Sequence, residues 1–576
     1  MRFAPLGPVA IILANLVTVL VLCFYKLDTT DQWEWETVSY RTGFITIAQL
    51  PLTFLLAGRR NIIGYLTGMG YERLNWFHRW VSRTLWLTAT IHMGFWFRNW
   101  GQYDYIIHQL HNDVLAKRGF SAWCILTFIV ISSAAPIRRI SYEFFVLQHL
   151  VTFVGFIMAV WLHAPREVKA WVWVPIGLLV FDRVVRYAYA THANMSVFHR
   201  ASCKHPLWAN RASFTPLPGN VTRITIESPG VRWEPGQHVF LTCHSIAPLQ
   251  CHPFTISSLP SDNKMEFLVR AEKGATKRFF EYASKHDYAL GSCEAASLST
   301  KQELPMFIDG PYGLYRPLRQ FDSVILLTGG MGVTFTMPCL RDIVAGWKET
   351  AQQQSHGKRH TVTKRVRFVW VIKSYIQLGW FEAQLQSVLD DVAECRRLQP
   401  EIPRDVRITI YVTCAEALED TDLATCSRPQ PQGFSSPASV AEVDEKGPTS
   451  LDSNITVQPE PSSSSSNERH QAQGGSFSNG CCCTNPVKDE NLITDAQAQP
   501  IMNAPVNPIK TIPGRPHPRT IIREVLEKAE GESAVAVCGP PGLLDDVRRS
   551  VVALSDERAV HKGTGAQGIY LHVERF

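Results

Sequence analysis

Four histidines, arranged as two pairs with the same spacing, constrain this chain more than any other feature of its sequence. His78 and His92 lie 14 residues apart in one apolar segment, and His149 and His163 lie 14 residues apart in another. In an α-helix, 14 residues fall about 40° short of four full turns and rise about 21 Å, so both members of a pair face the same way. Two such helices that face each other would offer two histidine clamps, one above the other.

Two facing imidazoles at each level are the arrangement that holds a haem iron from both sides. An ionisable side chain inside a membrane helix is also costly, and it marks a functional position by default. We therefore expect two b-type haems, one held by His78 with His149 and the other by His92 with His163. The alternative is four unrelated histidines that are hydrogen-bonded between helices, and the repeated spacing favours haem over it.

Residues 1–192 are predicted to form a membrane α-helical bundle of six spans. Each span approaches the ~20 residues that cross a ~30 Å hydrocarbon core. Lysine and arginine favour one set of loops, which includes Arg59, Arg60, Arg138 and Arg139, and such charge marks the cytosolic side. Both termini are then cytosolic, which makes His78 and His149 the inner pair. The expected spans are residues 8–25, 40–57, 74–97, 119–135, 143–163 and 170–189.

Composition excludes little but removes some classes of function. Hydrophobic residues make up 45% of the chain and charged residues 19%, and the net charge of +6 is too small to suggest a nucleic-acid partner. The 14 cysteines show no metal-site spacing. Most of them lie in the part that we place in the cytosol, so we expect free thiols and not a disulfide framework.

Residues 193–318 change to a strand pattern. A Pro235-Gly236-Gln237 turn enters a strand, the run 252–255 reads His-Pro-Phe-Thr, and residues 310–313 form a Gly-Pro-Tyr-Gly turn. In this order the segments resemble the flavin-binding β-barrel of the ferric reductase and NADPH oxidase superfamily. The resemblance implies that FAD contacts the His-Pro-Phe-Thr run and has its pyrophosphate near a Gly-x-Thr turn. The matching residues are His252, Pro253, Phe254, Thr255, Gly274 and Thr276, and we add Gly310 of the later turn.

Residues 319–415 and 514–576 are predicted to form an α/β nicotinamide-binding domain. An apolar strand at 323–328 runs into a glycine-rich turn, which lets backbone N–H groups approach a phosphate. Such turns are common, but this one resembles the Gly-Gly-x-Gly-x-Thr segment of the same family, and residues 538–540 resemble its Cys-Gly-Pro segment beside the nicotinamide. The residues concerned are Gly329, Gly330, Gly332, Thr334, Cys538, Gly539 and Pro540.

Two further roles come from the resemblance. It gives catalytic positions to Cys538, beside the nicotinamide, and to the terminal aromatic Phe576, which would cover the flavin face. It also places basic residues at Lys373 and Arg515, where they would read the 2′-phosphate of NADPH. Either cation could be an ordinary surface charge, and the two together favour NADPH over NADH.

Residues 416–513 read as a disordered low-complexity insert within this domain. The segment holds five consecutive serines at 462–466 and many prolines. It cannot bury enough apolar surface to offset the entropy of ordering. Cys481, Cys482 and Cys483 suggest palmitoylation of a cytosolic thiol cluster, and chance composition explains them equally well.

Taken over nearly the whole chain, the resemblance is to a fungal-type ferric reductase. It implies an electron path from cytosolic NADPH through FAD, the inner haem and the outer haem to external Fe(III) or Cu(II), supporting metal uptake. An NADPH oxidase that makes superoxide shares every cofactor motif, and a transporter or scaffold with an inactive soluble half is the more distant alternative. The plasma membrane is expected, with the vacuolar or another internal membrane left open.

The loop 98–118 is the expected docking site of the external acceptor, because it follows the helix that carries His92. It holds two acids and two histidines, which suit Fe(III) or Cu(II) bound transiently. An ordinary solvated loop is an equal alternative. The four side chains are Asp104, His108, His111 and Asp113.

Overall fold

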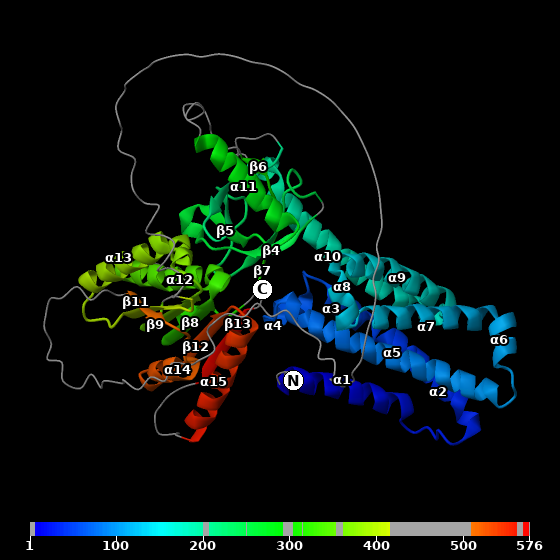
Figure 1. Cartoon of the computed structure of the whole chain (residues 1–576). Helices are drawn as coiled ribbons and strands as arrows, with labels where there is room; N and C mark the ends of the chain where they lie inside the picture. Colours follow the sequence, from blue (N-terminus) through cyan, green and yellow to red (C-terminus); the bar gives the residue numbers. More distant parts are fainter. Residues whose placement is uncertain are drawn as a thin grey trace, which may run out of the picture.

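A bundle of long helices lies beside two smaller soluble domains in the computed structural model (Figure 1). The structure describes residues 6–199, 207–248, 250–291, 303–313, 315–352, 361–414, 509–560 and 568–574. The bundle consists of α1 (Leu6–Phe24), α2 (Trp35–Ala48), α3 (Leu50–Ala57), α4 (Ile62–Thr67), α5 (Tyr71–Gly101), α6 (Ile106–Asn112), α7 (Val114–Ser132), α8 (Ala135–Ile140), α9 (Tyr142–His163) and α10 (Lys169–Asn194).

Helices occupy all six segments that were expected to cross a membrane. Within the described residues, three of them are long and apolar enough to do so by length and composition, namely α1, α7 and α9. The second expected span is divided, because α2 ends at Ala48 and α3 begins at Leu50, with Pro51 in its first turn. The 31-residue α5 and the 26-residue α10 carry charged residues in the half nearer the soluble domains. These charges make both helices less apolar than the other candidates.

The bundle combines an apolar outer surface with polar contacts between its helices. On α9, Leu147, Val151, Val154 and Met158 are exposed at helical spacing, which is the pattern of a surface that faces lipid. Inside, Gln49 of α2's C-terminus donates from Nε2 to Thr88 Oγ1 of α5 at 3.0 Å. Such hydrogen bonds hold helices together where lipid removes the hydrophobic driving force.

The flavin-type domain has two antiparallel sheets around one apolar core. Alternation along β2 puts Ile224 and Ile226 inside and leaves the residue between them half-buried, as the two-residue period of a strand requires. Helix α11 (Ala275–Gly291) packs against β1. The sheet orders are β5-β2-β1-β6 and β4-β3-β7. The strands are β1 (Arg211–Leu217), β2 (Val221–Glu227), β3 (His238–Thr242), β4 (His252–Thr255), β5 (Lys264–Arg270), β6 (Leu304–Pro305) and β7 (Phe307–Tyr312).

The last domain is a parallel six-stranded sheet with helices on both faces, in strand order β11-β10-β9-β8-β12-β13. Alternate residues of β8 serve the two faces: Val324 and Leu326 join the core under α12 and α13, while Ile325 and Leu327 join that under α14 and α15. The elements are β8 (Ser323–Gly329), α12 (Val333–Ala351), β9 (Arg365–Ile372), α13 (Glu382–Leu398), β10 (Asp405–Val412), β11 (Ile509–Pro513), α14 (Pro518–Glu527), β12 (Ser533–Cys538), α15 (Pro541–Val560) and β13 (Ile569–Glu574).

The predicted insert is wrong at its C-terminal end. Ile509–Pro513 form strand β11, which pairs in parallel with β10 from Ile408 to Val412. The strand takes its order from a partner about a hundred residues earlier, and no local pattern announces it. The rest of the expected insert, with its serine run and Cys481, Cys482 and Cys483, lies outside the described residues.

Candidate functional site

The outer histidine pair is brought together from α5 and α9. The ring centroids of His92 and His163 lie 6.1 Å apart and their planes are inclined at 68°. His92 Nδ1 lies 2.6 Å from the Ser39 carbonyl oxygen and His163 Nδ1 lies 3.0 Å from that of Leu115. A carbonyl only accepts, so each Nδ1 carries the proton and each Nε2 keeps a lone pair for a metal. With metal–nitrogen bonds of ~2 Å, this ring spacing accommodates one iron between the imidazoles.

In the inner pair, only His78 has its Nδ1 bonded to a backbone carbonyl. His78 Nδ1 donates to the Thr53 carbonyl at 2.8 Å. His149 lies on α9 near His78, but its buried Nδ1 has no hydrogen-bond partner among the described residues. The ring of Phe145, one turn earlier on α9, lies 5.5 Å from that of His149. The outer rings thus meet as the spacing predicted. All four side chains are imidazoles, a type that can ligate haem iron.

Glycines make room for both outer rings. A Cβ at Gly119 would lie 2.6 Å from His163 Cε1, and a Cβ at Gly43 would lie 2.9 Å from His92 Cε1. Each glycine is four residues after the carbonyl that accepts from the same ring, so one helical turn holds the imidazole on two sides. Sequence reasoning missed both glycines, although each lies in a predicted span where glycine has no helical advantage.

Of the residues expected at the flavin, the His-Pro-Phe-Thr run forms β4 at one edge of the second sheet, and Gly310 lies on β7 at the other edge. Thr255 closes β4, and its buried Oγ1 has no partner among the described residues, which suits a hydrogen bond to a bound flavin. Gly274, at a φ of +62°, has the Gln250 side chain 3.2 Å from its Cβ position, so the Gly-x-Thr turn adjoins the start of β4. Thr276 Oγ1 is engaged locally with Glu272 N and the Lys273 carbonyl. His252 and Phe254 are half-buried, and Pro253 is exposed.

The nicotinamide-type residues gather at the carboxyl ends of the parallel strands. Strand order reverses between β8 and β12, and ligands of such sheets bind outside the carboxyl ends at this switch point. Gly329 follows one strand and Gly539 and Pro540 follow the other, and a Cβ at Gly329 would lie 2.6 Å from Pro540 Cδ. Gly330 is in the left-handed region at +55° with open space around it. Gly332 abuts the Cys538 carbonyl, and the buried Thr334 hydroxyl donates to Met331 O at 2.9 Å.

The two expected phosphate-binding cations lie on the same edge of the sheet. Lys373 follows β9 and Arg515 comes just after β11, and both are exposed. One strand, β10, separates them, which places their backbones about 10 Å apart across the sheet. Both side chains can therefore reach a common anion beyond the strand ends.

Of the two residues expected to be catalytic, the structure describes Cys538 but not Phe576. Cys538 is fully buried at the end of β12, and burial raises the pKa of its thiol well above the ordinary value. The group is thus a neutral thiol at physiological pH and shapes the site without serving as a nucleophile. Phe576 lies outside the described residues, which end at Glu574.

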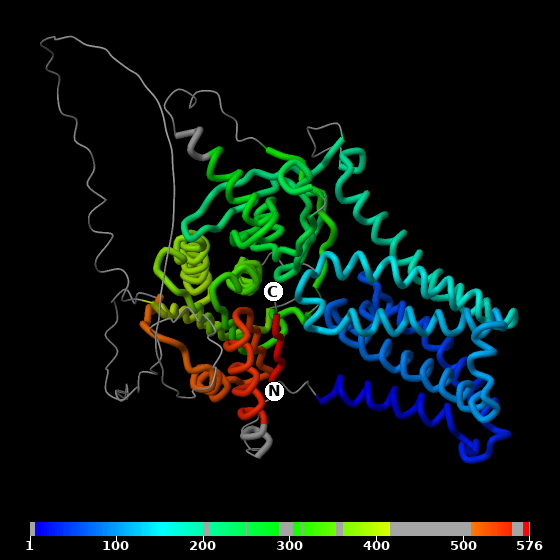
Figure 2. The backbone as a smooth tube through the Cα atoms, turned by 45° about the vertical axis from the view of Figure 1, so that its right-hand side comes forward, coloured from blue at the N-terminus to red at the C-terminus, as the bar shows by residue number. Residues whose placement is uncertain are grey.

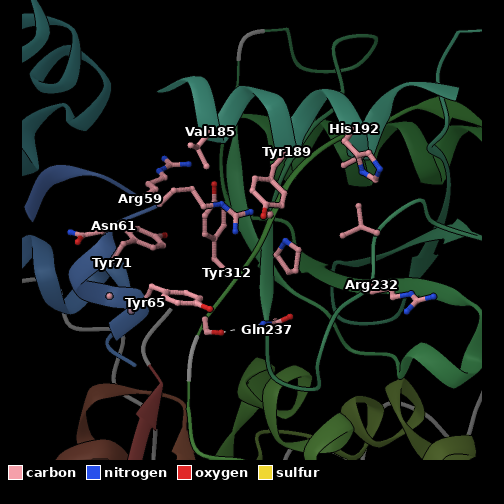
Figure 3. A pocket seen from close by; sticks show the side chains of 18 of the residues that line it. Arg59, Asn61, Tyr65, Tyr71, Val185, Tyr189, His192, Arg232, Gln237 and Tyr312 are labelled. Atoms are coloured by element: carbon pink, nitrogen blue, oxygen red, sulfur yellow. Dashed lines mark hydrogen bonds between the residues drawn. The ribbon is translucent and has the colours of Figure 1, made fainter. Parts of the chain in front are cut away.

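A cavity of about 950 Å³ lies where the bundle meets the flavin-type domain. Figure 3 shows Arg59, Tyr71 and Tyr312 pointing toward one another in this cavity, below the α10 residues Val185 and Tyr189. Gly310, expected at the flavin, also lines it. Leu74 lines the cavity one helical turn before His78, so the cavity reaches from the flavin-type domain to the part of α5 next to that histidine.

Sequence reasoning missed this junction. Arg59 and Arg60 were read as topology signals alone, yet both lie over aromatic rings that line the cavity, those of Tyr71 and Tyr312 respectively. The sequence did hold one indication of it, because an acid inside an expected membrane span, here the sixth, marks a functional or structural contact. That residue, Asp182, is buried and accepts a hydrogen bond from the Arg60 backbone N–H at 2.8 Å.

The loop 98–118, expected to receive the acceptor, forms a short helix but no preformed metal site. His108 and His111 lie three residues apart on α6, hence on one face. Asp113 accepts from Leu115 N at 2.8 Å and so caps α7. Among the residues that the structure describes, no group of three or more histidines, cysteines or acids is placed to hold a metal ion.

Three protein-family models match successive parts of the chain. Residues 42–160 match the ferric reductase like transmembrane component, residues 208–316 an FAD-binding domain, and residues 321–552 the ferric reductase NAD binding domain. An Aspergillus oryzae protein named "Probable cell surface ferric reductase" is 27% identical over 73% of this chain and 54% of its own length. The ferric/cupric reductase transmembrane component 2 of Saccharomyces cerevisiae is 27% identical over 51% and 38%. The chain thus spans about half or less of the length of these relatives.

Likeness to solved structures is weaker. A ferredoxin NADP+ reductase from Neisseria gonorrhoeae with bound FAD and NADP aligns with 64% of this chain and 97% of its own, at 10% identity and a TM-score of 0.31. Scores this low leave the fold to be judged from the sheet order and register described above.

Proposed function

Because the chain belongs to the ferric reductase family, a family of multi-pass membrane oxidoreductases, we propose that it is an NADPH-dependent metalloreductase. It carries electrons from cytosolic NADPH through FAD and two b-type haems to Fe(III) or Cu(II) on the opposite side of the membrane. The observation that carries the proposal is the pairing of His92 with His163 inside a bundle whose helix α5 also lines, at Leu74, a cavity that opens onto the flavin-type domain. The plasma membrane is the proposed location.

In this proposal six membrane spans surround the haems. The spans are α1, α2 with α3, α5, α7, α9 and α10, and residues 1–192 are the haem domain. Backbone carbonyls hold three of the four ligand imidazoles in the tautomer that presents Nε2 to iron. Rings already fixed in this way lose little rotational freedom when they bind a metal, so the site is organised in advance.

Residues 193–318 would hold FAD, with Thr255 donating to the ring system and the α11 N-terminus near the pyrophosphate. Residues 319–415 and 514–576 would hold NADPH across the β8–β12 switch point, and Lys373 and Arg515 would pair with its 2′-phosphate. When bound, FAD supplies the conversion of a two-electron donor into single-electron steps. The protein's part is to bind, align and keep apart these groups, and no general acid or base is needed where Fe(III) is reduced.

The α6 loop is the proposed approach of the external acceptor. His108 stacks on Tyr105 with centroids 4.3 Å apart and is thereby oriented, while Asp113 is already occupied as a helix cap. The variant for testing should therefore spare Asp113 and combine His108→Ala, His111→Ala and Asp104→Asn. Asparagine suits the left-handed backbone of Asp104, whose φ is +55°. We expect a raised KM for metal with unchanged haem spectra, and an unchanged KM would remove this loop from acceptor binding.

The deciding experiment uses the full-length protein, purified in detergent with haem and FAD. Two haems and one flavin are expected per chain. NADPH should reduce both, and reoxidation should be followed with Fe(III), Cu(II) and O₂ as competing acceptors. Faster reoxidation by either metal supports the metalloreductase. Superoxide formation that outpaces both metals would instead establish an NADPH oxidase.

A further inference from the structure

A buried carboxylate joins the flavin-type domain to the membrane helices at the edge of the cavity. Asp309, on β7, is 5% exposed. Its Oδ2 accepts from Arg186 Nε at 2.9 Å and from Arg186 Nη2 at 2.6 Å, and Arg59 Nη1 lies 3.4 Å away. Arg186 belongs to α10 and Arg59 to the segment between α3 and α4, so three distant parts of the chain meet at one oxygen.

The other carboxylate oxygen is held from its own strand. Tyr312 donates its hydroxyl to Asp309 Oδ1 at 2.7 Å. Burial raises the pKa of Tyr312 to about 12, so this hydroxyl stays protonated and remains a donor. Arg59 also lies 3.9 Å above the Phe240 ring of β3, which adds a cation–π contact across the same junction.

A second contact repeats the connection at the end of α10. The Asn194 side chain donates to Ile308 O at 2.6 Å and accepts from Ile308 N at 2.8 Å, which pairs it with the β7 backbone next to Asp309. One uninterrupted helix therefore runs from the bundle into the flavin-type domain (Figure 2) and is fixed there at two points about two turns apart.

We propose that Asp309, with Arg186 and Arg59, forms an ionic latch that sets the separation between bound flavin and the inner haem, and so controls the electron-transfer step between them. Charges shielded from water in this way interact strongly, and loss of one partner leaves the other buried and unpaired. Each NADPH delivers two electrons to the flavin, and each electron reduces one ferric haem iron, so two haem reductions balance one NADPH oxidation. Asp309, Arg186 and Arg59 are positioning residues in this step, and the inference rests on the proposed function.

The chain offers a matched control at the other junction of the same domain. Asp262, in the short turn Pro260–Asp262, accepts two hydrogen bonds from Arg341 of α12, both at 2.7 Å. The side chains of this pair are 16% and 18% exposed, much like the 7% and 19% of Asp309 and Arg186. This pair ties the flavin-type domain to the nicotinamide-type domain and lies away from the bundle.

The test compares Asp309→Asn and Arg186→Gln with Asp262→Asn in full-length protein loaded with haem and FAD. Anaerobic rapid mixing with NADPH separates loss of flavin absorbance from growth of the reduced haem band. We expect the haem step to slow by at least about tenfold in the first two variants, since displacements near 1 Å can cost that much or more. Their rate of flavin reduction by NADPH should stay unchanged. The double variant should be no slower than Asp309→Asn, because both changes break one interaction.

The haem step should keep its rate in Asp262→Asn. An unchanged haem step in Asp309→Asn, or an equal slowing in Asp262→Asn, overturns the latch. If Asp309→Asn loses haem or flavin, Arg186→Lys replaces it, because lysine keeps the charge but loses the second donor. A smaller slowing of the haem step then supports the latch and an unchanged rate overturns it. Wild-type protein without NADPH-reducible haem would contradict the proposed function itself, which separates the two failures.

Discussion

The bundle and the nicotinamide-type domain prepare their candidate cofactor sites by different means. In the bundle, each ligand ring except His149 is held by a carbonyl 25 to 53 residues away in sequence. In the nicotinamide-type domain, the candidate groups lie in turns directly after strands β8, β9, β11 and β12, within single strand–turn–helix units. Sites in the bundle therefore depend on how helices pack, whereas those of the sheet depend mainly on local turns and on the parallel register.

The largest effect is expected from removing a histidine of the bundle, which should abolish haem binding there and leave the flavin-type and nicotinamide-type domains unaffected. His149→Ala should remove the inner haem and His163→Ala the outer one, because each change takes away one of the two imidazoles proposed to hold that iron. The measurement is haem content per chain, alongside flavin reduction by NADPH, which should be normal. Full occupancy by two haems in either variant would refute the assigned ligands.

The second change removes the cations beyond the carboxyl ends of β9 and β11 and leaves the bundle intact. Lys373→Ala and Arg515→Ala should each raise KM for NADPH about ten- to hundredfold and leave KM for NADH nearly constant, since a charge-assisted hydrogen bond contributes about 1.5–3 kcal/mol. Lys510→Ala is the control, because Lys510 is exposed within β11 and not beyond its carboxyl end. Equal effects on both nucleotides would show that these cations do not read the phosphate.

A third change sharpens the contrast between the two histidine levels. Gly119→Ala should lower occupancy of the outer haem and shift its electron paramagnetic resonance, because overpacking against His163 costs about 1–3 kcal/mol. Gly94→Ala is the matched control, since a Cβ there has nothing within 4 Å. Identical haem content and spectra in the two variants would mean that the ring does not need the glycine.

The smallest effect is expected from the low-complexity segment. Deletion of residues 430–500 preserves β11 and should leave flavin reduction by NADPH within about twofold of wild type, because loop length changes the free energy of folding only slowly. The rate and the FAD content are the measurements. Loss of FAD from the shortened protein would show that the segment is structural.

Local signals carried the sequence predictions that succeeded. The 14-residue spacing predicted that His92 and His163 would meet, and apolar runs ending in glycine turns predicted strands at β8 and β12. The latch could not be predicted, because Asp309 meets partners 123 and 250 residues away that read as ordinary topology charges. Strand β11 was missed for the same reason, since its order comes from β10. The ligands, domain boundaries and phosphate-binding cations stay predictions until the experiments above are done.

The continuity of α10 has a mechanical consequence. Its 26 residues extend about 39 Å, from the apolar half within the bundle to the half that carries Asp182 and Arg186 beside the flavin-type domain. An α-helix is stiff over this length, because each backbone N–H bonds the carbonyl four residues earlier. Arg186 and Asn194 attach the flavin-type domain to this helix, so the helix and the domain form one mechanical unit. Any tilt of α10 inside the bundle is thereby transmitted to the flavin-type domain as a rotation.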